Sequence, residues 1–330
     1  MEKKVDERDA NFAPGVSVVL PILNEERFLA DAISAILAQK YAGKLEVILA
    51  LGPSRDKTDE IARELAAKDA RVVLVASPTG RTAAGLNRAI AKAQYSIICR
   101  IDGHAQISDT YIAQAVATMR ATGAVNVGGV MAAEGQNSFE RAVATAMRSP
   151  LGVGGARFHV GGKAGPADTV YLGVFDRAAL QAAGGYDERF TRAQDWELNF
   201  RLRQAGGVIW FDPALVVTYR PRPNFKTLAK QYFEYGRWRR AVIRSHKGTV
   251  NYRYLAPPIA VVISALSLIA GLVVNSIGFI PVALYVVGNI AGSLVIGKSW
   301  SERMRLPAVL ATMHFSWGIG FLTSPKNLVE

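Results

Sequence analysis

The sequence predicts an α/β protein with a doubly wound, mostly parallel sheet, followed by a C-terminal segment of transmembrane helices. Short β-rich runs alternate with helical patterns over the first 130 residues, which is the order that builds a parallel sheet. No charged side chain occurs from Leu255 to Gly297, and Leu306 to Pro325 contains none except a potential charge on His314. A membrane span needs about 20 apolar residues, so we expect three spans, at about 256–274, 278–297 and 306–324.

The elements of the predicted sheet follow one another regularly. Apolar residues recur three and four positions apart from Phe28 to Leu37, as on one face of a helix. We expect helices near 25–39, 57–68, 81–93 and 108–121. The strands between them are expected at 16–20, 45–50, 72–76, 96–101 and 125–130.

The region after residue 150 is less regular. Six glycines between 151 and 168 predict a flexible loop near a site. A strand at 169–174, a helix at 194–205 and short strands at 208–211 and 215–219 are expected to follow. Residues 224–245 place aromatic and aliphatic side chains on one side and basic ones elsewhere, a pattern that favours a helix in a membrane interface. An ordinary surface helix packed on the domain is the alternative.

The charge of the chain is positive and unevenly distributed. The formal net charge is +12, and from Arg220 to Arg253 ten Lys or Arg residues face one acid, Glu234. Nucleic acid is one partner that a basic protein can bind. Because this cluster directly precedes the first apolar stretch, we expect an anionic membrane leaflet as its partner instead, and no nucleic acid.

The ends of the chain and its cysteine predict a cytoplasmic location for the first 250 residues. Residues 1–14 form a charged tail with no apolar core of a signal peptide. The single cysteine, Cys99, excludes an internal disulfide and lies in an apolar run typical of a buried thiol. The basic loop at 298–305 is expected on the same side of the membrane, with the C-terminus outside. His314, within the third expected span, is predicted to be neutral and hydrogen-bonded to a neighbouring helix.

Polar turns follow the first two predicted strands. Pro21, Asn24 and Glu25 lie just past the first strand, and Asp56 lies past the second. Ligands of open α/β sheets bind outside the carboxyl ends of the strands. Each of these turns can also serve only to cap the following helix.

A third polar turn carries Arg81, with Asn87 on the next helix. An arginine at a helix start can meet a phosphate, because that end of a helix already attracts anions. Neither the glycine-rich dinucleotide fingerprint nor the P-loop pattern occurs at the first turn, so those two kinds of site lose support.

The fourth turn, after the strand that ends near Arg100, pairs a carboxylate with an imidazole. Asp102 and His104 are two positions apart, so an extended backbone points both the same way. Such a pair suits a divalent cation, Mn²⁺ or Mg²⁺, bridging to a diphosphate. A polar strand-end turn without a ligand is the alternative.

An acidic pair opens the predicted helix at 194–205. Asp195 and Glu197 follow Gln194, where the helix dipole alone would favour carboxylates. In a cleft, such a carboxylate could instead accept the proton of an attacking hydroxyl group.

These motifs, in this order, resemble the family 2 glycosyltransferases over residues 15–245. The segment Val16–Glu25 looks like that family's opening strand and nucleotide turn, Asp102-Gly103-His104 like its metal motif, and Gln194-Asp195 like the acidic pair that holds its base. Further segments are similar to membrane-bound exopolysaccharide glucosyltransferases of the succinoglycan type: Gly152-Val153-Gly154, Val160–Lys163, Asp168–Val170 and Tyr235–Trp238.

The resemblance implies a Rossmann-like A-type glycosyltransferase fold, a nucleoside diphosphate sugar donor, a divalent metal and inversion at the anomeric carbon. One base suffices for a single in-line displacement. It implies a catalytic domain at 15–222, a basic amphipathic interface helix at 223–254 and the membrane segment at 255–325. The enzyme would be a multi-pass protein of the plasma membrane with its catalytic domain in the cytoplasm.

The expected site residues can be grouped by role. Asp195 is the expected base, and Asp102 and His104 are the expected metal ligands. Expected contacts to the donor are Pro21, Asn24, Glu25, Asp56, Arg81, Asn87, Arg100 and Asp102. Expected contacts to a polyprenyl-linked acceptor and its phosphates are Gln194, Trp196, Arg237, Trp238, Arg239 and Arg240. His159, in the glycine-rich loop, is either a further contact to the diphosphate or metal or a surface histidine.

The sequence departs from the family's pattern at two places. The second turn lacks an additional Asp before the Ser, since Ala50, Leu51 and Gly52 stand there, so a UDP-sugar is a preference only. Gln231 lies six positions before Arg237, which is not the spacing of processive synthases and favours single addition. A catalytically impaired membrane scaffold with this fold is the alternative function; a transporter would need spans with internal acids.

Overall fold

The computed structural model describes residues 13–329, and the chain divides into two compact units. Unit 1 contains residues 1–131 and 162–218, and unit 2 contains residues 132–161 and 219–330. The expected tail, 1–14, lies outside the described residues except for its last two positions. Residues 132–161, which the sequence analysis placed in the catalytic domain, belong to unit 2 because the helix at 138–147 packs on the last helix of the chain.

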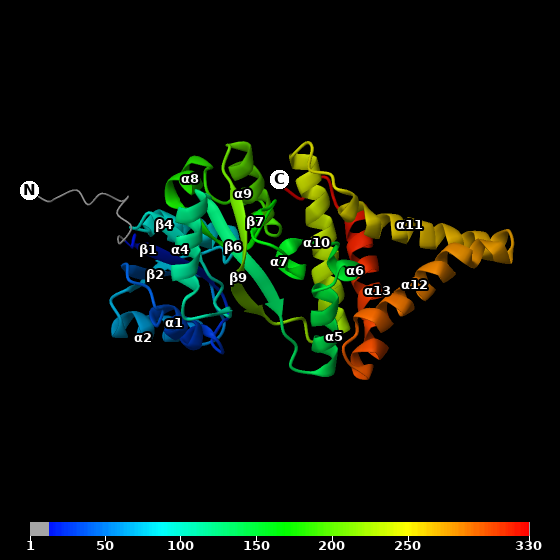
Figure 1. Cartoon of the computed structure of the whole chain (residues 1–330), viewed down its shortest axis with the longest axis horizontal. Coiled ribbons are helices and arrows are strands. Elements are labelled where there is room, and N and C mark those ends of the chain that lie inside the picture. The colour runs from blue at the N-terminus through cyan, green and yellow to red at the C-terminus, as the bar shows by residue number, and fades with distance from the viewer. Residues whose placement is uncertain (1–12, 330) are drawn as a thin grey trace, which may run out of the picture. The chain divides into compact units, whose positions relative to one another are not determined.

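Unit 1 is built on one mixed sheet (Figure 1). Its strand order is β3-β2-β1-β4-β8-β6-β9-β5, and β7 pairs with β9. The strands β1 to β4 are parallel, and β8 is antiparallel to β4 and β6. The strands are β1 Val16–Ile22, β2 Leu45–Leu51, β3 Val72–Ala76, β4 Ile97–Arg100, β5 Gln106–Ile107, β6 Asn126–Ala133, β7 Gly165–Pro166, β8 Tyr171–Asp176 and β9 Ile209–Tyr219. The predicted doubly wound, mostly parallel sheet is confirmed.

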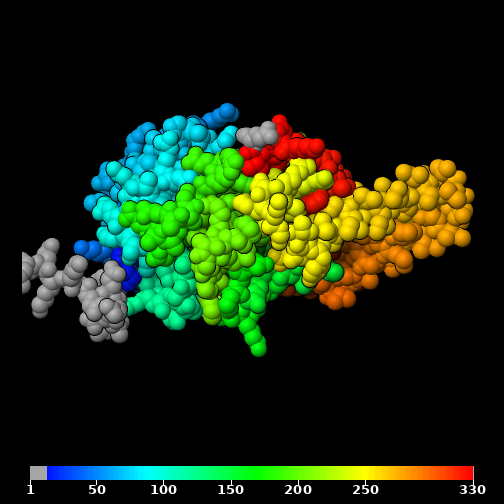
Figure 2. Space-filling model, turned by 90° about the horizontal axis from the view of Figure 1, so that it is seen from above, coloured from blue at the N-terminus to red at the C-terminus, as the bar shows by residue number. Residues whose placement is uncertain are grey.

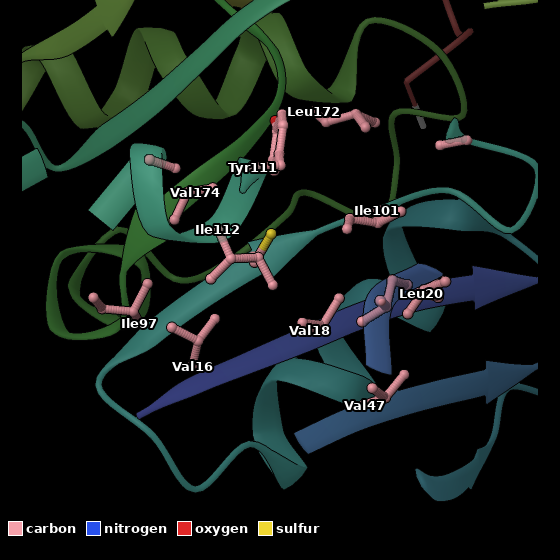
Figure 3. Packing of buried hydrophobic residues seen from close by; sticks show 14 of the residues in the cluster. Val16, Val18, Leu20, Val47, Ile97, Ile101, Tyr111, Ile112, Leu172 and Val174 are labelled. Carbon is pink, nitrogen blue, oxygen red and sulfur yellow. The ribbon is translucent and has the colours of Figure 1, made fainter. Parts of the chain in front are cut away.

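The helices of unit 1 follow the predicted alternation. They are α1 Leu29–Leu37, α2 Thr58–Lys68, α3 Thr82–Lys92, α4 Tyr111–Thr122, α8 Arg177–Ala182 and α9 Gln194–Gln204. The spacing that predicted α1 buries Leu29, Ile33 and Ile36. Figure 3 shows the core that these elements form, with Val16, Val18 and Leu20 of β1 beside Val47 of β2.

Two local predictions for unit 1 and its border were wrong. The expected short strands at 208–211 and 215–219 form one strand, β9. Pro213 lies between the segment of β9 that pairs with β7 and the one that pairs with β5, so its missing N–H interrupts neither ladder. The expected flexible loop at 151–168 instead contains the short helices α6 Pro150–Val153 and α7 Arg157–Val160 and the strand β7.

Unit 2 is helical apart from the ends of β6 and β9. Besides α6 and α7 it contains α5 Ser138–Met147, α10 Phe225–Ser245, α11 Tyr252–Val273, the 3-10 turn η1 Ser276–Phe279, α12 Ile280–Ile296 and α13 Trp300–Leu322. Helices α10 and α13 pack together through glycines: a side chain at Gly236 would collide with the carbonyl of Trp317, and one at Gly320 with the carbonyl of Phe233. Small residues of this kind let two helix backbones approach closely.

The prediction of a third membrane span is wrong. Of the helices that the structure describes, two are long and apolar enough to cross a membrane, and α13 is not one of them. Its first turns carry Glu302, Arg303 and Arg305, and its apolar side chains pack on α5, α10, α11 and α12. The apolar residues at 306–324 are therefore explained by packing of α13 inside unit 2. The multi-pass arrangement with an outer C-terminus is not supported.

The two remaining candidates form a hairpin, α11–η1–α12, that extends from the rest of unit 2 (Figures 1 and 2). Its helices bury few residues, and Leu272 and Val295 are among the exposed apolar side chains. Inside the hairpin, Ser267 donates to the carbonyl of Gly278 at 2.6 Å and accepts from the Val282 amide at 3.1 Å. A helix of 22 residues such as α11 is about 33 Å long, enough to cross the hydrocarbon.

Two predictions for unit 2 can be compared with its packing. His314 contacts Tyr285 of α12 through Nδ1 at 3.0 Å and the carbonyl of Leu151 through Nε2 at 2.7 Å, so its predicted hydrogen bond to a neighbouring helix is confirmed. Helix α10 spans almost the expected residues, and Leu228, Tyr232 and Val242 of its apolar face are buried. Packing inside unit 2 therefore explains the apolar face that had favoured a membrane interface.

Candidate active site

The turns after β1 and β2 are locked together at the carboxyl edge of the sheet. Asn24 has a left-handed backbone with φ of 56°, which Asn tolerates better than most residues. Its Oδ1 accepts from the amide of Arg55 at 2.8 Å, and its own amide donates to Ser54 at 3.0 Å. Asn24 therefore shapes both turns, while its contact to a donor stays a prediction.

Asp56 has a similar local task. Its carboxylate accepts from the Thr58 hydroxyl at 2.5 Å, from the Thr58 amide at 3.1 Å and from the Glu26 amide at 3.3 Å. The Thr58 hydroxyl hydrogen bond holds the pKa of Asp56 below its ordinary value. The Glu25 amide donates to the Thr58 hydroxyl at 2.7 Å, so this network also fixes the start of the Glu25 side chain.

The third turn is close to the second but leaves its arginine exposed. A Cβ atom at Gly52 would lie 3.1 Å from the Cα atom of Gly80, tighter than an ordinary contact, so the two turns approach closely at these glycines. Arg81 precedes α3 and is exposed, as a phosphate contact requires. Pro21 lies within β1, opposite Ala50 of β2.

Asn87 holds another segment in place. Its amide group exchanges two hydrogen bonds of 2.8 Å with the backbone of Tyr186 and donates to Glu188 at 3.0 Å. Gly185 makes this possible, because a side chain there would meet Oδ1 of Asn87. The side chain expected to contact the donor thus positions the turn before α9.

Arg100 brings the two central carboxylates together. Its guanidinium forms an ion pair with Asp195 and contacts Asp102 at 3.2 Å. The arginine side chain is 5% exposed, against 30% for Asp195 and 22% for Asp102. The fourth turn and the start of α9, 95 residues apart in the chain, therefore meet at one cluster.

Burial and the neighbouring charges act in opposite directions on the pKa values of Arg100 and Asp195. Burial raises the pKa of Asp195 and Asp102 raises it further, whereas Arg100 acts in the opposite direction; the net result is a pKa above the ordinary value. Burial alone would lower the pKa of Arg100, but Asp195 and Asp102 hold it well above the ordinary value. Arg100 therefore stays charged and favours the ionised, proton-accepting form of Asp195.

Tyr186 is a member of this cluster that the sequence analysis missed. Its ring lies 5.8 Å from the guanidinium carbon of Arg100, and its side chain is buried. Burial raises the pKa of the Tyr186 hydroxyl. Its place in Gly184-Gly185-Tyr186 before an acidic helix was the only signal in the sequence.

His104 and Glu25 join the first and fourth turns. Nδ1 of His104 lies 2.8 Å from Oε1 of Glu25. A carboxylate on one ring nitrogen is the usual support for a histidine that binds a metal through the other. Among residues 13–329, no three His, Cys, Asp or Glu side chains form a complete metal site. Mg²⁺ and Mn²⁺ accept one or two protein ligands when phosphates and water supply the rest, so Asp102 and His104 fit such an ion.

The start of α9 contains one structural acid beside the candidate base. Ala193 has φ of 59° and precedes the helix. Glu197 is buried and bonds Arg201 at 2.7 Å, and Arg201 in turn donates to the carbonyls of Ala183 and Gly185. Of the two acids, Glu197 thus fixes the Gly184-Gly185 turn.

The remaining expected contacts to the acceptor fall in both units. Gln194 and Trp196 are nearly buried in α9, and Trp196 stacks on Phe200 with 5.6 Å between ring centroids. In unit 2, Trp238 is buried and Arg237 pairs with Glu234 at 3.0 Å. The structure gives Trp196 and Arg237 local contacts and buries Gln194 and Trp238. The contact of these four side chains to an acceptor stays a prediction.

Two arginines and His159 complete the expected set within unit 2. Arg240 donates to the carbonyls of Phe321 at 3.1 Å and Leu322 at 3.4 Å, at the end of α13. Arg239 lies over the ring of Tyr254 at 4.1 Å. His159 lies in α7.

Comparison with known proteins identifies the family of the chain. Residues 17–183 match the family Glycosyl transferase family 2. The chain is 33% identical over 312 residues to the succinoglycan biosynthesis protein ExoA of Rhizobium meliloti, covering 92% of this chain and 93% of that protein. It is 26% identical to the glycosyltransferase AglE of Haloferax volcanii, covering 66% of this chain and 71% of AglE.

Solved structures show the same fold. The mannosyltransferase PcManGT from Pyrobaculum calidifontis, in complex with GDP-Man and Mn²⁺, superposes with a TM-score of 0.64 at 20% identity, covering 92% of this chain and 86% of that one. Residues 1–349 of S. aureus TarS, in complex with UDP, superpose with a TM-score of 0.51 at 15% identity, covering 94% and 90%. These two likenesses establish the A-type glycosyltransferase fold alone. Together with the family match and the ExoA-like sequence, they show that the chain is a glycosyltransferase and belongs to family 2.

Proposed function

We propose that this protein transfers one sugar from a nucleoside diphosphate sugar to a lipid-linked acceptor at the cytoplasmic face of the plasma membrane, with inversion at the anomeric carbon. The product would serve the synthesis of an exopolysaccharide or another glycan of the cell envelope. A UDP-sugar is the preferred donor, although relatives of the same fold were solved with GDP-Man and with UDP.

The observation that carries the proposal is the convergence of Asp102, Arg100 and Asp195 at the carboxyl edge of the sheet. His104 follows Asp102 by two residues in a turn that the Ala105 amide closes by donating to the Asp102 carbonyl at 2.9 Å, so the extended backbone expected between them is not found. The imidazole of His104 is held by Glu25. One end of the cluster thus offers ligands for a divalent ion and a diphosphate, and the other end offers a carboxylate. A donor and an acceptor hydroxyl need these two kinds of group side by side.

Asp195 is assigned the role of general base. Its carboxylate accepts the proton of the acceptor hydroxyl as the oxygen attacks the anomeric carbon, and the bond to the diphosphate breaks on the opposite side. A single displacement of this kind needs one base and no second carboxylate as nucleophile. Arg100 supports the role because its positive charge favours the ionised form of Asp195.

Asp102 and His104 would hold a divalent ion, Mn²⁺ or Mg²⁺. When bound, the ion would neutralise charge on the leaving nucleoside diphosphate. Glu25 would orient the His104 ring for this contact. Arg81, exposed at the start of α3, would meet a phosphate.

The membrane location is supported by the hairpin and by the distribution of charge. Unit 2 contains 17 Lys and Arg residues against 5 Asp and Glu residues, whereas unit 1 contains 22 of each. The whole net charge of +12 thus belongs to the unit that carries the apolar hairpin. Basic side chains beside a membrane segment are attracted by anionic lipids.

A catalytically impaired scaffold is the second candidate. Its support is the second turn, where Ala50, Leu51 and Gly52 replace the expected additional acid. In this case the chain would bind a nucleotide sugar tightly and transfer it to no acceptor.

The test is a transfer assay with the full chain in detergent, using UDP-, GDP- and dTDP-sugars, Mn²⁺ and polyprenyl phosphate and diphosphate acceptors. Asp195→Asn keeps a hydrogen-bond acceptor for Arg100 but removes the base, so transfer should fall by about 10²–10⁴-fold while donor binding persists. The control Asp69→Asn changes an exposed acid paired with Arg71 and should leave transfer unchanged. Full activity of Asp195→Asn would remove that residue from the mechanism. Donor binding without turnover on any acceptor would favour the scaffold.

A further inference from the structure

Helix α9, which carries Asp195, has no capping side chain at its start. Ala193 precedes the helix with a left-handed backbone, and its side chain has no group that could bond the first turn. The first amide groups of a helix have no partner inside the helix, so an uncapped start is weakly held. Contacts further along α9 can therefore decide where Asp195 lies relative to Arg100.

A buried chain of hydrogen bonds is centred on Asn199 of α9. Its side-chain oxygen accepts from the amide group of Asn126 at 2.7 Å, and its own amide group donates to the Thr169 hydroxyl at 2.8 Å. Asn126 begins β6, and Thr169 lies two residues before β8, the neighbouring strand. We call these three residues the asparagine network. It ties α9 to two adjacent strands of the sheet.

The sheet makes room for this network at a cost in stability. Gly173 of β8 has φ of 117°, and a Cβ atom there would lie 2.6 Å from Oδ1 of Asn126. That oxygen is buried and makes no hydrogen bond within the described residues, which is unfavourable for folding. Apolar side chains of the same shape would fill the space without this penalty. Stability alone therefore does not explain the asparagine network.

The network and the candidate base lie on the same side of α9. Asp195 and Asn199 are four positions apart, and side chains at this spacing are neighbours on a helix surface. A rotation or shift of α9 that moved Asn199 would move Asp195 by a similar amount. Hydrogen bonds that fix Asn199 therefore also fix the carboxylate that forms the ion pair with Arg100.

We propose that Asn199 is a positioning residue for sugar transfer, and that the asparagine network holds Asp195 at Arg100. The proposal rests on the proposed function, in which Asp195 is the base. A base acts only when the acceptor hydroxyl attacks, so misplacing it slows the reaction without weakening the binding of the donor. A displacement of about 1 Å can lower a rate by about 100-fold.

The test replaces the network by apolar side chains of similar shape, with Asn126→Leu, Asn199→Leu and Thr169→Val in one triple variant. Replacing all partners of a hydrogen bond in this way is nearly neutral for stability, so we expect a Tm within about 3 °C of the native value. Transfer by the full chain in detergent should show a kcat lowered by about 10- to 100-fold and a donor KM within about threefold. A native kcat would overturn the proposal.

Thr169 offers a milder pair of variants that keeps both asparagines. Thr169→Val preserves the shape and removes the hydroxyl to which Asn199 donates, whereas Thr169→Ser keeps that hydroxyl. Thr169→Val should lower kcat by about 3- to 10-fold, and Thr169→Ser should retain it. Equal kcat values for the pair would count against the network, including in the case that the triple variant does not fold.

Thr118→Val controls for the loss of a hydrogen bond elsewhere in unit 1. The Thr118 hydroxyl, on α4, donates to Asp212 at 2.6 Å. Its loss should lower Tm at least as much as Thr169→Val does, because the acceptor is charged, yet leave kcat and KM unchanged. A comparable decrease in kcat would mean that any weakening of unit 1 slows transfer, and the positioning role would be wrong.

A second measurement needs no transfer reaction. It compares the decrease in Tm caused by Arg100→Met in the native chain and in the triple variant. If Asp195 has moved away, Arg100 keeps only Asp102, so the decrease should be about half as large in the triple variant. Equal decreases would show that the network does not place Asp195. A native chain that transfers sugar to no acceptor would instead contradict the proposed function, and this comparison would still stand.

Discussion

Replacing Arg100 with methionine would remove the guanidinium that pairs with both Asp102 and Asp195 while keeping a long, apolar side chain in its place. Removing one partner of a fully buried ion pair costs about 3–5 kcal/mol, because the remaining charge is left unpaired. Here the arginine is 5% exposed, but the carboxylates retain 22% and 30% exposure, so water screens part of the loss. We expect a destabilisation of about 2 kcal/mol at neutral pH.

Thermal unfolding in detergent, followed by tryptophan fluorescence, measures this loss. For a unit of this size, about 2 kcal/mol corresponds to a decrease in Tm of about 4–8 °C. The pH dependence gives a second check. The pKa of Asp195 is already above its ordinary value, and loss of Arg100 raises it further, so the folded state of the variant holds a proton that the unfolded chain releases. The folded variant therefore loses stability as the pH rises from about 4 toward neutrality.

The matched control is Arg71→Met, which removes an exposed guanidinium paired with Asp69 at 2.7 Å and should change Tm little. Arg100→Met should thus show a Tm deficit that is small near pH 4 and full at neutral pH. A Tm within about 1 °C of the native value at neutral pH, or a deficit that grows on acidification, would refute the assigned electrostatics.

Three further predictions concern single side chains. Gly236→Ala should destabilise the protein by about 1–3 kcal/mol, because the new side chain meets the carbonyl of Trp317. The control Gly288→Ala in α12 meets nothing within 4 Å and should be neutral or stabilising. Equal Tm values for the two variants would contradict the packing of α10 on α13. Burial raises the pKa of Cys99 to about 12, so the folded protein at pH 8 should resist iodoacetamide and react once per chain after unfolding in urea; rapid labelling of the native chain would be inconsistent with this. Asn24→Gly should lose only the hydrogen bond to the Arg55 amide, which lowers the free energy of unfolding by about 1 kcal/mol. Asn24→Ala should lower it by about 1–2 kcal/mol more, because alanine is strained in the left-handed backbone. Identical urea midpoints for the two variants would argue against a fixed conformation at this turn.

The site shows which parts of the arrangement can be inferred from local pattern. Asp102 and Asp195 were expected because each follows or begins an element whose end faces the same edge of a parallel sheet. Their link through Arg100 was not expected, since residues 95 positions apart meet only through the antiparallel insertion of β8 beside β4. Tyr186 was missed for the same reason, because its contact to Arg100 depends on Asn87 holding the turn from another helix.

The sequence by itself determined the parallel strands, the α1 face, the four polar turns and the two apolar helices of the hairpin, because periodicity and composition report whether a segment is buried or exposed to an apolar solvent. The sequence did not distinguish burial against other helices of the protein from burial in a lipid membrane. The segment at 306–324 is apolar enough to suggest a membrane span, yet Gly318 and Gly320 place it against α11 and α10 within unit 2. Only tertiary structure decided that, because an apolar side chain gains similar free energy from a neighbouring helix and from lipid, and the partner is chosen by shape.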